Sequence, residues 1–459
     1  MPAHPVSLTT ALLLTGCATF NAPHAQLERL RSGSVGSELA GVAVAQRDAT
    51  GHFSAAAAGC AQFADDGHRC RAPLTDDTLL RVASISKLAT TLGVMRLVES
   101  GKLALDRDVS DYLGFTLRNA VFADRAITLR QLLAHSSSLV DGEIYWAPHP
   151  QTLQQLLADQ THFDGARAPG SCFRYTNLNF GVIASIIERV SGERFDRFMQ
   201  HAVFGRAHIE AGFNWSGLTA VAPQRVGGIW RRAAPDASPD AAANNTEAVN
   251  TAAQRNAPWQ AQLDDFQGRA PTVGVRYHGA GSVDRSRLRP PPEDYVLGSN
   301  GTLFSPQGGM RISLRGLIAL GEQWLPRRSQ AGHAPPSPHL LTDASLDILL
   351  GVADPPELLP DCDHGVLPPS RHYGLGVEVL QFSVGGPRWV GHFGDAYGLK
   401  SALLVDRHAG VVRAYVINGS AQPIAPAAPP FVEMDRAEAA LLSAWPLSRI
   451  DHSEPRPAR

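Results

Sequence analysis

The feature that most constrains this 459-residue chain is where its hydrophobic pattern changes period. Short apolar runs of strand type occur near both ends of the chain, at 40–46, 53–58, 373–384, 389–393, 401–405 and 411–417. Short turns rich in glycine separate several of them, so consecutive runs should pair antiparallel. Between the two groups, apolar residues recur at helical spacing. We therefore predict an α+β fold: an antiparallel sheet flanked by helices and built from both termini, with an inserted, mainly helical domain.

The helical spacing is clearest after Lys87, and further helices are predicted at 129–134, 151–157, 180–190 and 431–445. Between 231 and 292 the chain is rich in Ala, Asn, Asp and Pro with weak periodicity, which predicts an irregular insertion with mobile loops. The resulting division is a leader at 17–38, a domain containing the sheet at 39–105 plus 297–446, a helical domain at 106–296 and a disordered tail at 447–459.

The charged residues of the chain are nearly balanced in sign, and very few of them are lysines. The 41 Lys+Arg nearly balance 43 Asp+Glu, and a net charge of −2 argues against nucleic acid or an anionic membrane as partner. Only three of the 41 basic residues are lysines: Lys87, Lys102 and Lys400. In a chain that otherwise uses arginine, each lysine is a candidate for a role that needs a removable proton.

The N-terminus predicts export. Residues 6–15 are apolar but too few to span a bilayer, which is typical of a signal peptide over 1–16. The segment LTGC ending at Cys17 resembles the bacterial lipobox, in which the cysteine is lipidated. The alternative is a secretory peptide cleaved elsewhere, with Cys17 removed. Either way we expect an exported, periplasmic protein, anchored by lipid in the first case.

Four cysteines remain: Cys60, Cys70, Cys172 and Cys362. In an oxidising compartment they allow three pairings, and we favour Cys60 with Cys70 across a short polar connection, which leaves Cys172 with Cys362. Four free buried thiols are the alternative. The absence of CxxC and HExxH patterns argues against a metal site, and no cofactor motif is present.

Ser84-Ile85-Ser86-Lys87 lies where strand periodicity gives way to helical periodicity. Residues three apart on a helix are neighbours, so Lys87 can reach the Ser84 hydroxyl. A desolvated lysine can accept a proton from that hydroxyl, which arginine cannot do. A solvated lysine at a helix start would explain the same four residues, so the pair needs further support.

That support is a resemblance. Ser84–Lys87 resembles the S-x-x-K motif of the serine β-lactamase, penicillin-binding protein and esterase superfamily, in particular its class C-like branch. Tyr175-Thr176-Asn177 resembles the Y-x-N motif of that branch, and His392-Phe393-Gly394 its H-x-G or K-T-G strand. GSNGTLFSPQGGMRIS at 298–313 resembles a later signature. The three catalytic motifs stand in the family order.

The resemblance implies a role for each position. Ser84 would be the nucleophile, while Lys87 and Tyr175 would share the proton transfers, in an order that the sequence leaves open. Backbone N–H groups of Ser84 and Asp395 would form the oxyanion hole. Asn177, His392 and Gly394 would bind substrate, with His392 contacting a carboxylate or the leaving group. His135, in the family's H-T-S-G-L segment, is expected to be structural, and Ser138 replaces the usual glycine there.

The implied activity is hydrolysis of an amide or ester through an acyl-enzyme: a D-amino-acid peptide, a cell-wall fragment or a small ester. Histidine in place of the lysine of K-T-G favours these over β-lactams, because only lysine is steadily cationic. The alternatives are a true β-lactamase and a non-hydrolytic lipoprotein that binds penicillin or peptidoglycan. A small molecule or peptide is the expected partner.

Overall fold

The computed structural model describes residues 21–218, 221–232, 256–267, 269, 271, 274–276, 288–289, 291–327, 338–351, 360–362, 371–382, 386–427 and 434–444. The expected signal peptide, the lipidation site at Cys17 and the expected C-terminal tail lie outside these residues.

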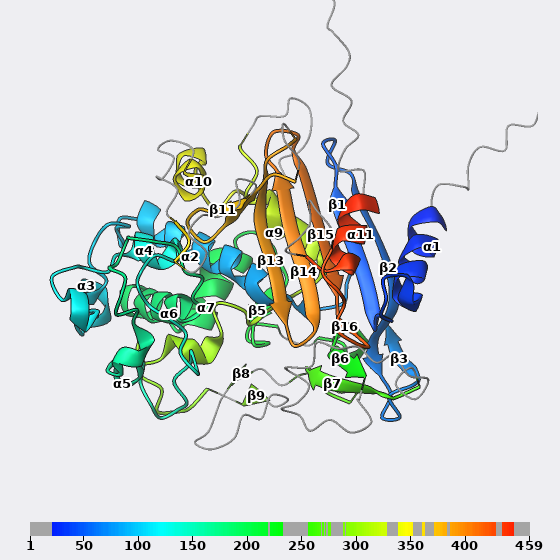
Figure 1. The fold of residues 1–459 in the computed structure, drawn as a ribbon, viewed down its shortest axis with the longest axis horizontal. Coiled ribbons are helices and arrows are strands. Elements are labelled where there is room, and N and C mark those ends of the chain that lie inside the picture. Colours follow the sequence, from blue (N-terminus) through cyan, green and yellow to red (C-terminus); the bar gives the residue numbers. More distant parts are fainter. Residues whose placement is uncertain are drawn as a thin grey trace, which may run out of the picture.

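One large sheet organises the described part of the chain (Figure 1). Every neighbouring pair of its strands is antiparallel. In spatial order the strands are β11 (Arg371–Tyr373), β12 (Glu378–Leu380), β13 (Trp389–Ala396), β14 (Leu399–Asp406), β15 (Val411–Ile417), β1 (Gly41–Arg47), β2 (Phe53–Phe63) and β3 (Cys70–Pro73).

The two ends of the chain meet inside this sheet. β1 pairs with β15 in a register that places Val42 opposite Ile417. The predicted α+β fold, with an antiparallel sheet built from both termini, is therefore confirmed.

Both faces of the sheet are covered. In β15, Val412, Ala414 and Val416 belong to the larger hydrophobic core, while Tyr415 and Ile417 belong to a second core on the opposite face. Alternate strand residues point to opposite faces, which explains why this strand is apolar throughout. α1 (Asn21–Arg29) and α11 (Arg436–Ala444) cover the second face, and α9 (Leu314–Glu322) packs on the first.

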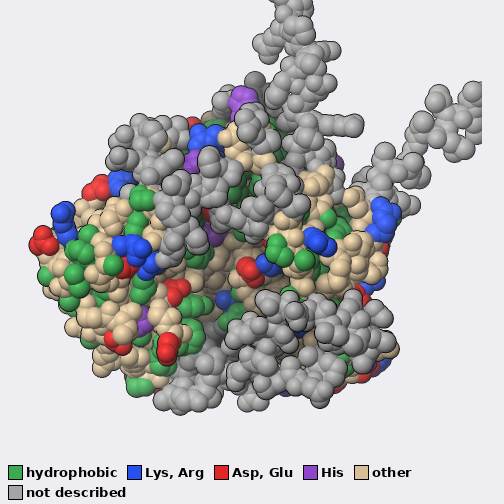
Figure 2. Space-filling model, viewed as in Figure 1, with side chains coloured by type: hydrophobic (Ala, Val, Ile, Leu, Met, Phe, Trp, Pro, Cys, Tyr) green, Lys and Arg blue, Asp and Glu red, His purple; other side chains and the backbone are tan. Residues whose placement is uncertain are grey.

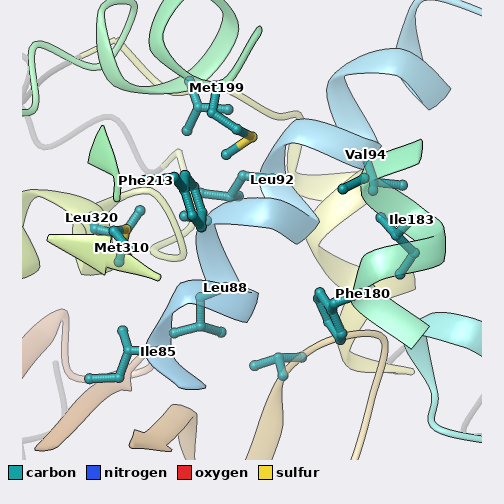
Figure 3. Packing of buried hydrophobic residues seen from close by; sticks show 14 of the residues in the cluster. Ile85, Leu88, Leu92, Val94, Phe180, Ile183, Met199, Phe213, Met310 and Leu320 are labelled. Carbon is teal, nitrogen blue, oxygen red and sulfur yellow. The ribbon is translucent and has the colours of Figure 1, made fainter. Parts of the chain in front are cut away.

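The other helices gather beside the sheet and share its larger core. Figure 3 shows Val94 of α2 (Ser86–Glu99) beside Ile183 of α6 (Leu178–Ser191), while Leu92 points to the other side of α2, toward Phe213. α6 is followed by Gly192, which ends the helix in the left-handed backbone that glycine permits. These helices are α2 (Ser86–Glu99), α3 (Ser110–Leu113), α4 (Leu129–Leu133), α5 (Leu153–Leu157), α6 (Leu178–Ser191), α7 (Phe195–Met199) and α10 (Asp343–Leu350).

The structure differs from the sequence expectations in three places. The leader at 17–38 contains α1, which packs on the sheet through Leu27, while Leu30 and Val35 follow in the same core. Three apolar residues are too few for a periodic signal, and the sheet face supplies their partners. The run at 373–384 is not one strand, because the chain reverses between β11 and β12 at Gly374 and Gly376.

The region at 231–292 was expected to be irregular, yet its described residues include strands. β6 (Ile229–Arg232) pairs with β7 (Trp259–Leu263) and with β16 (Gly419–Ser420). Along the chain, β16 comes directly after β15, a strand of the large sheet. Arg311 on β10 forms a fully buried ion pair with Asp264. Long-range pairing of this kind leaves no local periodicity. The remaining strands are β4 (Leu80–Arg81), β5 (Ala211–Phe213), β8 (Val275–Arg276), β9 (Leu288–Arg289) and β10 (Met310–Ile312).

Candidate active site

Ser84 occupies a tight turn between β4 and α2. Ala83 has a left-handed backbone (φ 45°), and the Ser86 hydroxyl donates to its carbonyl (2.6 Å) while accepting the N–H of Met310 (3.0 Å). From 78 to 95 every residue is buried except Ser84, which is partly exposed. The turn therefore fixes the backbone and presents one hydroxyl to the surface.

Lys87 lies beneath that hydroxyl and is fully buried. Its Nζ donates to Ser84 Oγ (3.1 Å), to Asn177 Oδ1 (3.0 Å) and to the carbonyl oxygen of Gln307 (3.1 Å). Burial lowers the pKa of Lys87 to about 7, while the charges of Asp141 and Glu378 act in the raising direction. Near neutral pH a substantial fraction of Lys87 is uncharged and able to accept a proton.

Asn177 stands at the start of α6 but does not cap it. Its Nδ2 donates to Asp141 Oδ2 (2.9 Å), which orients the amide oxygen toward Lys87. The other carboxylate oxygen of Asp141 accepts the N–H of Leu178 at the start of α6 (2.9 Å). Burial raises the pKa of Asp141. Asp141 therefore connects the helix start to the lysine, and sequence reasoning missed it.

Tyr175 borders the same space. Its ring centroid lies 4.6 Å from Lys87 Nζ, and its side chain is 37% exposed. His135 stacks on Tyr175 with centroids 4.5 Å apart and accepts the N–H of Thr176 at Nδ1 (3.0 Å). Burial lowers the pKa of His135 well below its usual value, so it is a neutral support behind the tyrosine. This fits its expected structural role, and Ser138 adopts a left-handed backbone (φ 64°) where the family has glycine.

β13 passes directly beside the serine turn at Gly394. A Cβ built on Gly394 would lie 2.4 Å from the carbonyl oxygen of Val82 and 2.3 Å from Ser401 Oγ, so only glycine fits. The next residue, Asp395, is exposed and pairs with Lys400 (2.7 Å), which lies 3.8 Å from Glu438 on α11. These ion pairs give Lys400 a structural role that the sequence did not suggest.

His392, which the resemblance implies as a substrate contact, is almost completely buried. Its side chain is 2% exposed, Nε2 lies 2.9 Å from the Tyr373 hydroxyl and Nδ1 lies 3.3 Å from Glu378. The Tyr373 side chain on β11 and the Glu378 side chain on β12 enclose its ring. The sequence missed Tyr373 and Glu378, which are close to His392 only through strand pairing.

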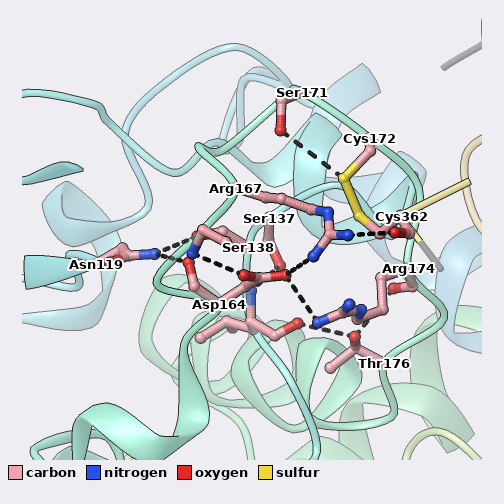
Figure 4. Close-up of polar contacts among 12 residues, drawn as sticks. Asn119, Ser137, Ser138, Asp164, Arg167, Ser171, Cys172, Arg174, Thr176 and Cys362 are labelled. Carbon is pink, nitrogen blue, oxygen red and sulfur yellow. Dashed lines mark hydrogen bonds and ion pairs between the residues drawn. A yellow bond between two sulfur atoms is a disulfide. The ribbon is translucent and has the colours of Figure 1, made fainter. Parts of the chain in front are cut away.

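A disulfide lies near the tyrosine segment. Cys172 is joined to Cys362, and Phe173 exchanges backbone hydrogen bonds with Pro360 and Cys362. Figure 4 shows Arg167 between this disulfide and Asp164. The other disulfide joins Cys60 to Cys70. The two disulfides are therefore the pairing that the sequence analysis favoured. Disulfides of this kind persist in oxidising compartments.

The site opens on a hollowed face of the molecule. Figure 2 shows the hollow between the helical part and the sheet, with acidic and basic side chains at its edge. Among the described residues no group of His, Cys, Asp or Glu is placed to hold a metal ion. No helix within the described ranges is long and apolar enough to cross a membrane.

The chain is similar to several known proteins. A family model described as β-lactamase matches residues 28–433. Penicillin-binding protein 4* of Bacillus subtilis is 29% identical over 163 residues, 34% of this chain and 34% of that protein. Esterase EstB of Burkholderia gladioli is 31% identical over 144 residues, 26% of this chain and 34% of the esterase. The matched part thus spans about a third of each relative.

Solved structures show the same fold over nearly the whole chain. A D-stereospecific amidohydrolase from Streptomyces has 19% identity and a TM-score of 0.57, covering 92% of this chain and 98% of its own. A D-amino acid amidase from Ochrobactrum anthropi has 18% identity and a TM-score of 0.57, covering 93% and 98%. At this identity the likeness establishes the fold.

Proposed function

Because this chain belongs to the β-lactamase family, we propose that it is a serine hydrolase that cleaves an amide or ester through an acyl-enzyme. One observation carries the proposal. A fully buried lysine, with its pKa lowered to about 7, donates to the one partly exposed hydroxyl of the turn. A nucleophile beside a desolvated base is the arrangement that covalent acyl transfer needs.

The first step forms a bond between Ser84 Oγ and the substrate carbonyl carbon. Lys87, uncharged, takes the hydroxyl proton, and the carbonyl oxygen becomes an oxyanion. The tetrahedral intermediate then collapses and breaks the bond to the leaving nitrogen or oxygen. The leaving atom receives a proton from Lys87 or Tyr175. Water then attacks the acyl-enzyme and releases the acid, restoring Ser84.

The oxyanion would be held by the N–H groups of Ser84 and Asp395. The close approach of β13 at Gly394 supports this assignment, since it brings the strand against the turn before Ser84. Asn177 would position Lys87 and a substrate amide, and Gly394 would leave room for the substrate on the strand.

The expected substrates are D-amino-acid peptides or amides, cell-wall fragments and small esters. The names of similar proteins support this range: an esterase, a penicillin-binding protein and D-amino acid amidase structures. β-Lactam hydrolysis is the second candidate, favoured only by the family resemblance. We further propose that the protein is exported and that Cys17 carries a lipid anchor.

The test is covalent labelling with a fluorophosphonate and with a fluorescent penicillin, followed by intact mass. We expect one adduct per chain, absent in Ser84→Ala and retained in Ser100→Ala, an exposed serine at the end of α2. Equal labelling of wild type and Ser84→Ala would contradict the nucleophile. Stable labelling with no turnover of any ester or amide would favour a binding protein.

A further inference from the structure

The third-motif histidine is enclosed by two partners from neighbouring strands. Tyr373 on β11 places its hydroxyl 2.9 Å from His392 Nε2. At the other side of the ring, Nδ1 lies 2.5 Å from the carbonyl oxygen of Phe393 and 3.3 Å from Glu378 Oε1. Two oxygen acceptors at Nδ1 keep a hydrogen there, so in the neutral ring Nε2 accepts from Tyr373.

Glu378 determines the net charge at this position. Its side chain is 1% exposed, and Glu378 sits on β12 opposite Gly391, directly before the histidine. A buried carboxylate beside imidazole gives a pair that is neutral when the ring is protonated and negative when it is not. With Glu378 ionised, the third motif presents no net positive charge to a ligand.

Two other described side chains lie near the ring and carry no positive charge. Tyr175 and His135 lie on the helical side, and burial keeps His135 neutral. Lys87 is a nearby cation, and its Nζ donates hydrogen bonds to Ser84, Asn177 and Gln307.

We propose that Glu378 is a specificity-determining residue. By pairing with His392 it removes the cation that a substrate carboxylate would need, so the site favours esters and amides whose leaving group is uncharged. The inference rests on the proposed hydrolase function and narrows its substrate class. A substrate carboxylate that approaches the His392–Glu378 pair loses its hydration, and the pair, being neutral or negative, offers it no opposite charge in return.

The test uses two ligands that differ in that charge and in one methyl group: N-benzoyl-D-alanyl thioglycolate and its methyl ester. Release of the thiol gives kcat/KM for both. In the wild type, we expect kcat/KM for the methyl ester to exceed that for the acid by at least about tenfold between pH 5.5 and 8. The acid lacks a cationic partner in this site, and a missing ion pair of this kind lowers affinity by at least that factor. Glu378→Gln should shift the ratio of the two kcat/KM values toward the acid by up to about tenfold, and more at pH 5.5 than at pH 8, because only a protonated imidazole attracts a carboxylate.

Three variants separate the charge from other effects. Glu378→Gln combined with His392→Asn should lose the shift, because no imidazolium remains. Glu143→Gln, on the exposed loop after Asp141, should keep the wild-type ratio. Tyr373→Phe leaves the charge pair intact and should also keep the ratio within about twofold. A tenfold shift of the ratio toward the acid in Tyr373→Phe would overturn the proposal. The Tyr373 hydroxyl, and not the charge of Glu378, would then determine the preference for the methyl ester.

Binding of the same two ligands to Ser84→Ala, measured by calorimetry, tests the inference without turnover. Tighter binding of the methyl ester supports it. Tighter binding of the acid, lost on adding His392→Asn, would overturn it by showing that His392 binds carboxylate. Absence of turnover in wild type alongside the expected binding preference would contradict the hydrolase proposal and leave the charge assignment supported.

Discussion

Lys87 Nζ lies 3.1 Å from the Ser84 hydroxyl, and the lysine side chain has no access to solvent. The contact itself follows from a spacing of three residues across a helix start. Its chemical value comes from the burial, which lowers the pKa of Lys87 to about 7. A lysine at the same spacing on a solvated helix would remain charged at neutral pH.

The first prediction concerns the identity of the base. Lys87→Arg should lower kcat/KM by roughly 10²–10⁴-fold, because arginine keeps its proton at every accessible pH. In wild type, kcat/KM should rise with pH through about 7, as Lys87 loses its proton. Ester hydrolysis across pH 5–9 measures both. Wild-type turnover by a folded Lys87→Arg protein would refute the proposed role.

A second prediction follows from Asp141, whose charge raises the pKa of Lys87 and whose oxygen orients Asn177. Asp141→Asn should move the rising limb of the pH profile below its wild-type position and lower the maximum rate. The matched control is Glu143→Gln, two residues away and exposed. A reduced rate with an unmoved limb would mean that Asp141 acts only by packing.

Burial of Lys87 should also cost stability. Its pKa is lower in the folded than in the unfolded chain, so the unfolded state binds more protons between about pH 7 and 10.5, and stability rises with pH across that window. Lys87→Met should therefore raise the free energy of unfolding by on the order of 1–4 kcal/mol at pH 7 while abolishing activity. The gain should shrink as pH approaches 10.5. Urea unfolding at pH 7 and 9.5 gives both values, and a destabilised Lys87→Met would contradict the account.

His135 supports Tyr175 by stacking at 4.5 Å and by holding the N–H of Thr176. His135→Leu should lower kcat by roughly 10–100-fold, since small displacements of a catalytic group have effects of this size. The KM should change little. His52→Leu, at an exposed position, provides the comparison. Equal kinetics in the two variants would show that the tyrosine does not depend on the histidine.

The two disulfides should differ in their effects. Cys172–Cys362 closes 190 residues and Cys60–Cys70 closes 10, so the loop-entropy model gives the first a stabilisation roughly 2–3 kcal/mol larger. Because Cys172 lies three residues before Tyr175, its replacement with Ser, together with Cys362→Ser, should also lower kcat. Thermal unfolding and ester hydrolysis of the two double variants test this. A larger loss of activity from the Cys60–Cys70 pair would be the contrary outcome.

The sequence by itself determined the fold class and five strands of the large sheet, β1, β2, β13, β14 and β15, because side-chain periodicity follows from which faces are buried. It also determined the Ser84–Lys87 pair, which depends only on local helical geometry. It failed for α1 and for the strands at 229–232 and 259–263, where few apolar residues find partners far along the chain.

Only the tertiary structure decided the surroundings of that pair. Asp141, Gln307 and Glu378 come from three segments that no spacing in the sequence relates to Lys87, and strand pairing turned His392 inward toward Glu378. Desolvation is a property of the assembled core, so the lowered pKa of Lys87 appears only when α2, α6 and the sheet close around it.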